Sequence, residues 1–260
     1  MKNFKVIESR DNALIKLIVA LQGTSKARKE NGLFVLEGLR ICDDAAQNNI
    51  QFDKFIVSNT AFSRLKKDID KLSENAQDCY IIPDNLYKKI SDTISPQGVM
   101  AVAKILSRTF EVIDVKGKYI ALENVSDPSN LGAIARTGEA LGISGIILSA
   151  NGCDPYSPKV LRASMGTLLR MPVFLLENFA EEIGKLGLKT YSAVVDDDAK
   201  PITEISFEEG CCIIIGNEAN GITEETKKVS DCLFTIPMSG RAESLNAAVA
   251  ASISIWEMMK

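Results

Sequence analysis

Short apolar runs and segments of helical periodicity alternate along the first hundred residues. The runs predict strands, which fall at residues 34–37, 52–57, 78–83 and 98–105. Apolar positions at helical spacing predict the intervening helices, which cover residues 11–30, 38–47, 61–74 and 84–90. Alternating strands and helices are typical of an α/β unit.

A polar stretch at residues 107–117 interrupts this pattern, and a second alternation follows it. We therefore predict a domain at 1–106, a linker at 107–117 and a second α/β domain at 118–260. Strands of the second domain are predicted at residues 119–123, 145–148, 173–176, 190–195, 211–215 and 232–236. Its helices are predicted at residues 130–141, 157–166, 180–186, from 223 onward, and from 247 to 259.

Composition places the chain among globular proteins. Of 260 residues, 46% are hydrophobic and 25% are charged, which argues against disorder. No apolar run reaches the roughly 18 residues that a bilayer span requires. The first residues lack the apolar core of a secretory signal, so we predict a cytoplasmic protein without a membrane partner.

The chain contains no histidine, which excludes the commonest general base and the commonest zinc ligand. Its six cysteines show no C-x-x-C spacing and are interpreted as reduced, buried thiols. Any chemistry must therefore use arginine, acidic residues, lysine or hydroxyl groups.

Charge is distributed unevenly along the chain. The net charge is −4, but residues 1–40 carry an excess of four positive charges, including Lys26, Arg28, Lys29 and Arg40. Such a local excess is compatible with an arm that faces a polyanion. A solvated amphipathic surface accounts for these charges equally well.

A polar turn joins the strand predicted at 119–123 to the next helix. Pro128 fixes φ in this turn, Asn130 is able to cap the helix, and Arg136 follows six residues later, between one and two helical turns on. Both polar groups would then face the strand ends, where α/β proteins bind ligands. A capped helix with an exposed arginine is the structural alternative.

A second polar turn, Gly216-Asn217-Glu218, follows the fully apolar run at 211–215. It has neither the G-x-G-x-x-G order of a dinucleotide site nor the Gly-Lys-Ser/Thr of a phosphate loop. A purely structural turn explains Gly216 and Gly221 but gives no reason for Glu218.

The third polar stretch, residues 236–246, leads into the last helix. Pro237 and Gly240 shape the loop, and Ser244 taken alone is best interpreted as the N-cap of that helix. The apolar residues that recur at helical spacing in and before the helix predict its buried face: Leu245, Val249, Ile253 and Trp256.

Together these blocks resemble a known family. NVSDPSNLGAIARTGEALG, IIIGNEANGI and IPMSGRAESLNAAVAA look like motifs one, two and three of the SpoU/TrmH (SPOUT) family of S-adenosylmethionine-dependent RNA ribose 2′-O-methyltransferases, in the same order across residues 119–260. The segment NALIKLIVALQGTSKARKENGLFVLEGLRI is similar to the substrate-binding domain of the family's ribosomal-RNA members.

The resemblance implies a C-terminal parallel sheet with a deep trefoil knot, although knots are nearly absent from protein folds. It also implies a homodimer, S-adenosylmethionine as methyl donor, no metal, and ribosomal RNA as partner, with 23S rRNA favoured. The smaller N-terminal α/β domain would be similar to ribosomal proteins that bind kinked RNA.

Matching positions carry the family's roles over to this chain. Cofactor contacts would come from Gly216, Asn217, Ile236, Met238, Leu245 and Asn246. Catalytic positions would be Asn130, Arg136, Glu218, Ser244 and Asn246. RNA contacts would come from Lys26, Arg28, Lys29, Arg40, Asn130 and Arg136.

The implied reaction is an in-line attack of a ribose 2′-oxygen on the sulfonium methyl group. We expect Arg136 to bind the adjacent phosphate and stabilise the developing alkoxide, since a guanidinium stays protonated in proteins and is a poor proton acceptor. The base stays open among Arg136, Glu218 and a neighbouring phosphate. Two alternatives are a tRNA 2′-O-methyltransferase and a catalytically silent rRNA-binding or assembly factor.

Overall fold

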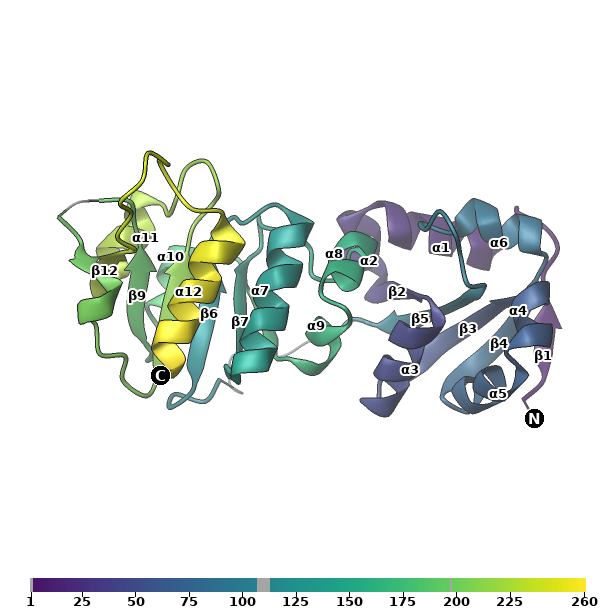
Figure 1. Ribbon diagram of the computed structural model, residues 1–260. Helices are drawn as coiled ribbons and strands as arrows, with labels where there is room; N and C mark the ends of the chain where they lie inside the picture. The colour runs from purple at the N-terminus through teal and green to yellow at the C-terminus, as the bar shows by residue number, and fades with distance from the viewer. Residues whose placement is uncertain (1, 107–112, 197) are drawn as a thin grey trace. The chain divides into compact units, whose positions relative to one another are not determined.

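The computed structural model describes residues 2–106, 113–196 and 198–260 (Figure 1). Contacts divide the chain into two compact units, Met1–Leu106 with Tyr156–Arg162, and Ser107–Pro155 with Ala163–Lys260. Part of the predicted linker, residues 107–112, lies outside the described residues. The segment Tyr156–Arg162 groups with the first unit, although the sequence pattern assigned it to the second domain.

The first unit contains a five-stranded mixed sheet in the order β1-β4-β3-β5-β2. Its strands are β1 (Phe4–Val6), β2 (Leu33–Glu37), β3 (Phe52–Ser58), β4 (Ala76–Ile82) and β5 (Val99–Lys104). β1, β4 and β3 run parallel, whereas β5 is antiparallel to both β3 and β2. The alternation predicted for this unit is present, and β1 is the additional strand.

Two of the helices predicted for the first unit are in fact pairs. Its helices are α1 (Ala13–Gly23), α2 (Ser25–Asn31), α3 (Leu39–Gln47), α4 (Asn59–Arg64), α5 (Lys66–Glu74) and α6 (Asp84–Ile90). Thr24 takes an extended conformation, and its side chain accepts from the Ala27 N–H to cap α2. The extended Thr24 ends α1, and its hydroxyl caps the free backbone N–H groups at the start of α2. The predicted continuous helix is therefore divided at Thr24.

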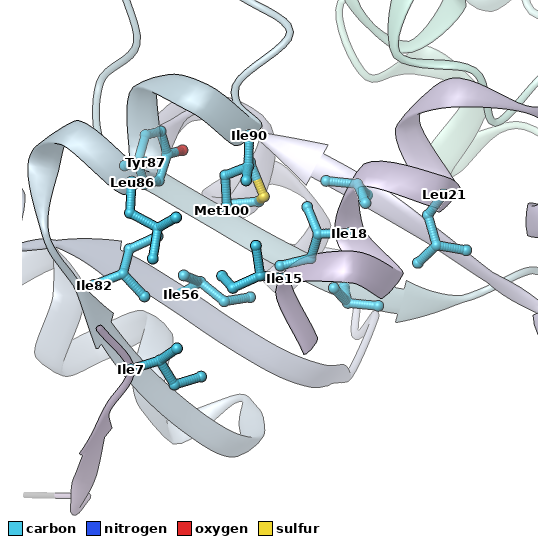
Figure 2. Packing of buried hydrophobic residues seen from close by; sticks show 12 residues of the cluster. Ile7, Ile15, Ile18, Leu21, Ile56, Ile82, Leu86, Tyr87, Ile90 and Met100 are labelled. Carbon is cyan, nitrogen blue, oxygen red and sulfur yellow. The ribbon is translucent and has the colours of Figure 1, made fainter. Parts of the chain in front are cut away.

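One face of α1 contributes to a hydrophobic cluster in the core of the first unit (Figure 2). Ile15, Ile18 and Leu21 recur every three residues and are buried against Ile56 and Met100 of the sheet. This spacing is the helical periodicity from which the helix was predicted.

The second unit contains a seven-stranded sheet in the order β10-β12-β9-β11-β6-β7-β8. Every pairing in it is parallel, as predicted. Its strands are β6 (Lys118–Leu122), β7 (Gly145–Ser149), β8 (Val173–Leu176), β9 (Lys189–Ala193), β10 (Lys200–Pro201), β11 (Cys211–Ile215) and β12 (Cys232–Thr235). Central strand β11 is buried along its whole length, as expected of a parallel sheet covered on both faces.

The later helices lie between these parallel strands in the chain, except α12, which follows the last strand. They are α7 (Pro128–Leu141), α8 (Pro158–Ala163), α9 (Thr167–Arg170), α10 (Phe179–Ile183), α11 (Glu224–Val229) and α12 (Ala247–Met259), with a 3-10 turn, η2, at Ile202–Glu204. The helix predicted at 157–166 is the shorter α8, and α9 begins only after the predicted range. Within the described residues, none of the helices combines the length and the apolarity that a bilayer span requires.

The last helix, α12, packs against α7, β11 and β6, and it lies beside α7 in Figure 1. The face buried in these contacts consists mainly of small residues, such as Ala247, Ala251 and Ser254. The predicted buried stripe was wrong at two of its four residues, because Val249 is 47% exposed and Trp256 is 56% exposed, while Leu245 and Ile253 are half-buried. Small side chains let two helices approach closely, so the larger residues are left on the outer face.

Candidate active site

A pocket of about 450 Å³ lies at the carboxyl ends of β9, β11 and β12. Its volume is within the roughly 300–1,000 Å³ of small-molecule sites, and ligands of open α/β sheets bind at this edge. The structure brings together seven of the predicted site residues in its lining: Gly216, Asn217, Glu218, Ile236, Met238, Ser244 and Leu245.

The turn after β11 forms one wall of this pocket. Asn217 and Gly221 exchange backbone hydrogen bonds of 3.0 and 2.9 Å, which close the turn. A Cβ atom on Gly216 would lie 2.1 Å from the Gly221 carbonyl carbon. Only glycine therefore fits at position 216 with the turn closed. The Asn217 side chain donates to the Asn124 carbonyl at 2.9 Å and so ties this turn to the end of β6.

Glu123, at the end of β6, anchors the far side of the same turn. Its buried carboxylate accepts from the Thr223 N–H at 2.9 Å and from the Thr223 and Thr226 hydroxyls, each at 2.8 Å. The sequence pattern did not single out Glu123. Glu123 could have been found from its position directly after an apolar strand. A carboxylate buried there requires several hydrogen-bond donors around it.

A chain of side-chain hydrogen bonds joins the three polar blocks. Asn130 donates from Nδ2 to Glu218 Oε1 at 2.8 Å, and Asn246 donates from Nδ2 to Asn130 Oδ1 at 3.0 Å. Asn246 Oδ1 in turn accepts from the backbone N–H groups of Ala248 and Val249. We call Glu218, Asn130 and Asn246 the polar triad.

Two capping assignments made from the sequence are corrected by this geometry. Asp127, not Asn130, caps α7, because its carboxylate accepts from the Ser129 N–H at 2.7 Å. Asn246, not Ser244, caps α12. Asn130 is thereby free to make its side-chain bonds inside the site, and Ser244 lies exposed on the pocket wall.

The ionisation of Glu218 fixes the orientation of Asn130. Burial by itself would raise the pKa of the Glu218 carboxyl, but hydrogen bonds from the Asn130 side chain and from backbone N–H groups outweigh burial and lower it. A carboxyl with a lowered pKa is ionised at neutral pH and can only accept hydrogen bonds. Asn130 must therefore turn its amide NH₂ toward Glu218 and its oxygen toward Asn246.

Arg136 lies on α7 with its side chain exposed. It makes no hydrogen bond or ion pair with any other described residue, and it is not among the residues that line the pocket. The structure therefore leaves its guanidinium available to a ligand outside the pocket.

The basic residues predicted near the N-terminus have different environments. Arg28 is only 4% exposed, and its guanidinium donates to the carbonyls of Leu21 and Gln22 at the end of α1. This burial gives Arg28 a structural role and argues against the predicted contact to RNA. Lys26 is exposed beside Glu30, and Lys29 and Arg40 are exposed.

Substitutions at Asn246 separate helix capping from the polar triad. Asn246→Ser keeps an oxygen cap but removes the donor to Asn130, whereas Asn246→Ala removes both. We expect both variants to bind the pocket ligand more weakly and turn over more slowly. Only Asn246→Ala should lose about 1 kcal/mol of unfolding free energy. Calorimetry measures the affinity for the pocket ligand, and thermal unfolding measures the stability. Normal kinetics in Asn246→Ala would show that Asn246 does not belong to the site.

The fold and the site define a parallel-sheet α/β protein with a small-ligand pocket at the strand ends. Residues 117–256 match the SpoU rRNA Methylase family, and residues 12–101 match the MRM3-like substrate binding domain. The chain belongs to the SpoU rRNA methylase family.

The chain is similar over nearly its whole length to several methyltransferases. The chain is 28% identical to the 23S rRNA (guanosine(2553)-2′-O)-methyltransferase RlmP of Bacillus subtilis, over 98% of this chain and 99% of that protein. An uncharacterised tRNA/rRNA methyltransferase of Synechocystis is 30% identical over 96% of this chain and 92% of its own. The crystal structure of an AdoMet-bound rRNA methyltransferase from Sinorhizobium meliloti superposes with a TM-score of 0.86 at 27% identity, covering 98% of this chain and 97% of that one.

Proposed function

We propose that the protein transfers the methyl group of S-adenosylmethionine to a ribose 2′-hydroxyl of ribosomal RNA, and specifically of 23S rRNA. The observation that carries this proposal is the polar triad, which joins residues of all three motif blocks beside a pocket of suitable size. The relative from Bacillus subtilis carries out this reaction on 23S rRNA according to its name.

The pocket residues suit a bent S-adenosylmethionine molecule. This donor supplies a methyl group activated by positive sulfur, and it also carries an ammonium, a carboxylate and a flat adenine ring. Acidic side chains of Asp196, Glu218 and Glu243 line the pocket and suit the positive charges of this donor. Lys227, whose ammonium pairs with Glu224, also lines the pocket. Apolar side chains such as Ile222, Ile236 and Leu245 provide surface for the adenine.

In this mechanism the protein mainly aligns the reacting atoms. Asn130 is held by Glu218 and Asn246, so its amide has one fixed orientation beside the site. Arg136, unpaired with any described residue, binds the phosphate next to the target ribose and stabilises the alkoxide as it forms. The lowered pKa of Glu218 makes it a weak base, which favours its role as the acceptor that orients Asn130.

The test is direct methylation of ribosomal RNA. Purified protein is incubated with labelled S-adenosylmethionine and unmodified 23S, 16S and transfer RNAs, and ribose methylation is mapped by resistance to alkaline cleavage. We expect one resistant position in 23S rRNA. If only transfer RNA were labelled, transfer RNA would be the substrate in place of 23S rRNA. If the protein bound rRNA but labelled no RNA, it would be a catalytically silent binding factor.

We also propose that the protein acts as a homodimer through α12 and α7. Val249 and Trp256 lie on the outer face of α12, with the half-buried Ile253 between them along the helix. An exposed tryptophan and valine at helical spacing form an apolar stripe of the kind that subunit contacts cover. A second copy of the chain is the occupant that the family resemblance implies.

Trp256→Glu should convert the dimer to a monomer without unfolding it, because position 256 is already half exposed. Analytical ultracentrifugation measures the mass in solution. Val115→Glu, at another exposed valine of the second unit, is the matched control and should stay dimeric. A dimeric Trp256→Glu variant, or a monomeric native protein, would contradict this interface.

Further parts of the proposal rest on the family resemblance. The first unit would bind the RNA, with Lys26, Lys29 and Arg40 contacting phosphates. The second unit would carry the deep trefoil knot around its last helix, and the protein would act in the cytoplasm. The match of residues 12–101 to a substrate binding domain supports the role of the first unit.

A further inference from the structure

The first unit has a pocket of its own, with a volume of about 520 Å³. It lies where β3 ends, between the start of α3, helices α4 and α6, and the chain that leads into β5. Its lining contains both charged and apolar groups, among them Leu39, Arg64, Leu65, Asp84, Lys88 and Gln97. All of these residues fall inside the segment 12–101 that matches a substrate binding domain.

Close packing shapes the inner wall of this pocket. Gly98 has a φ of +81°, and a Cβ atom there would come within 2.5 Å of Ser58 Oγ and 2.8 Å of Ala61 Cβ. Position 98 therefore excludes a side chain both by conformation and by space. The backbone entering β5 can lie directly against the end of β3 only because this residue is glycine.

Asp84 is a fixed acceptor in the lining. Its carboxylate accepts from the Thr60 N–H at 3.2 Å and from the Thr60 hydroxyl at 2.9 Å. Hydrogen bonds from Ser58 and Thr60 hold the pKa of the Asp84 carboxyl below its usual value. The side chain of Gln97 is also fixed, because its oxygen accepts a hydrogen bond from the Leu39 N–H at 2.8 Å. Its NH₂ group takes no part in that bond.

Two cations complete the lining. Arg64, at the end of α4, and Lys88, on α6, are both exposed, and neither makes an ion pair or a hydrogen bond with another described residue. The basic residues near the N-terminus differ, since Arg28 is buried and Lys26 lies beside Glu30. The Lys88 charge also helps to lower the pKa of the neighbouring Asp84 carboxyl. The two exposed cations together suit a phosphate.

We propose that this pocket holds one unpaired nucleotide of the substrate RNA. Arg64 and Lys88 contact its phosphates, the apolar surface of Leu39 and Leu65 packs on the base, and Asp84 and Gln97 hydrogen-bond the base edge. Sequence-specific RNA recognition targets unstacked bases in loops and bulges, where a protein can cover the face of the base and hydrogen-bond its edge. The inference rests on the proposed function, because it takes ribosomal RNA as the ligand.

The test compares two double variants of the full-length protein. Arg64→Ala/Lys88→Ala removes the two pocket cations. Lys67→Ala/Lys89→Ala removes two exposed lysines, one on α5 and one on α6, that do not line the pocket. Affinity for a 23S rRNA transcript is measured by filter binding over a series of KCl concentrations. The pocket variant should bind roughly tenfold more weakly, with a salt slope shallower by about one to two, because two phosphate contacts are lost. Its affinity for S-adenosylmethionine should be unchanged.

The control variant should bind the transcript with an affinity close to that of the native protein. An equal loss in both variants would show diffuse surface charge and overturn the pocket assignment, as would unchanged binding in the pocket variant. If the native protein fails to methylate any RNA, the proposed function fails, whatever the two variants do in the binding assay.

Photo-crosslinking gives a second readout of the same contact. A 23S transcript containing 4-thiouridine is irradiated with the native protein, and crosslinked peptides are identified by mass spectrometry. Crosslinks in residues 58–65 or 84–98 support the pocket. Crosslinks of the first unit confined to residues outside these two segments would overturn it.

Discussion

Arg136→Ala is expected to abolish methyl transfer while S-adenosylmethionine still binds. The side chain is exposed on α7, makes no ion pair or hydrogen bond with a described residue, and does not line the donor pocket. Its removal therefore leaves the fold and the pocket intact. Loss of a group that stabilises developing negative charge lowers turnover by about a hundredfold or more. Single-turnover methylation measures the chemical step, and calorimetry measures donor affinity.

Arg136→Lys is the matched variant for this prediction. Lysine keeps the positive charge but lacks the planar fork that contacts two phosphate oxygens at once. We expect partial recovery of turnover relative to Arg136→Ala. Equal losses of donor affinity and turnover in Arg136→Ala would assign Arg136 to the donor pocket and contradict its proposed contact with RNA.

Gly216→Ala should eliminate donor binding, because the turn after β11 cannot stay closed around a side chain. The added Cβ would lie 2.1 Å from the Gly221 carbonyl carbon and 2.2 Å from the Ile222 nitrogen, both of them backbone atoms. To relieve this overlap, the backbone hydrogen bonds between Asn217 and Gly221 must break. The turn carries Glu218, so the polar triad is expected to separate as well. Titration calorimetry measures the loss of donor affinity. Scanning calorimetry measures the loss of stability caused by opening the turn.

Gly240→Ala is the control for this glycine substitution. Gly240 lies in the loop before α12, outside the pocket lining, and a Cβ there meets no atom within 4 Å. We expect Gly240→Ala to keep donor affinity and stability close to those of the native protein. Native donor affinity in Gly216→Ala would show that the closed turn is not required for the pocket.

Most strands were predictable because each is a short apolar run between polar turns. β11 is the clearest case, since residues 211–215 are apolar throughout and completely buried. The strands that the pattern missed are β1, with three residues, and β10, with two. Such strands are too short to show a periodicity, and they exist because a neighbouring strand supplies their hydrogen bonds.

The outer face of α12 shows where hydrophobic pattern alone misleads. Val249 and Trp256 are more hydrophobic than Ala251 and Ser254, so helical spacing placed them inside. The structure places the small residues inside, where α12 meets α7. Close packing of two helices depends on side-chain volume, which a hydrophobic pattern does not measure.

The sequence by itself determined most of the order of strands and helices, the three polar blocks and their family, because each depends on residues adjacent in the chain. Only the tertiary structure decided that Asn130 bonds Glu218 and Asn246, which lie 88 and 116 positions further along. It also moved the helix caps to Asp127 and Asn246 and buried Arg28. Parallel strands are joined by long crossovers, so the partners at a sheet edge depend on strand order and not on local pattern.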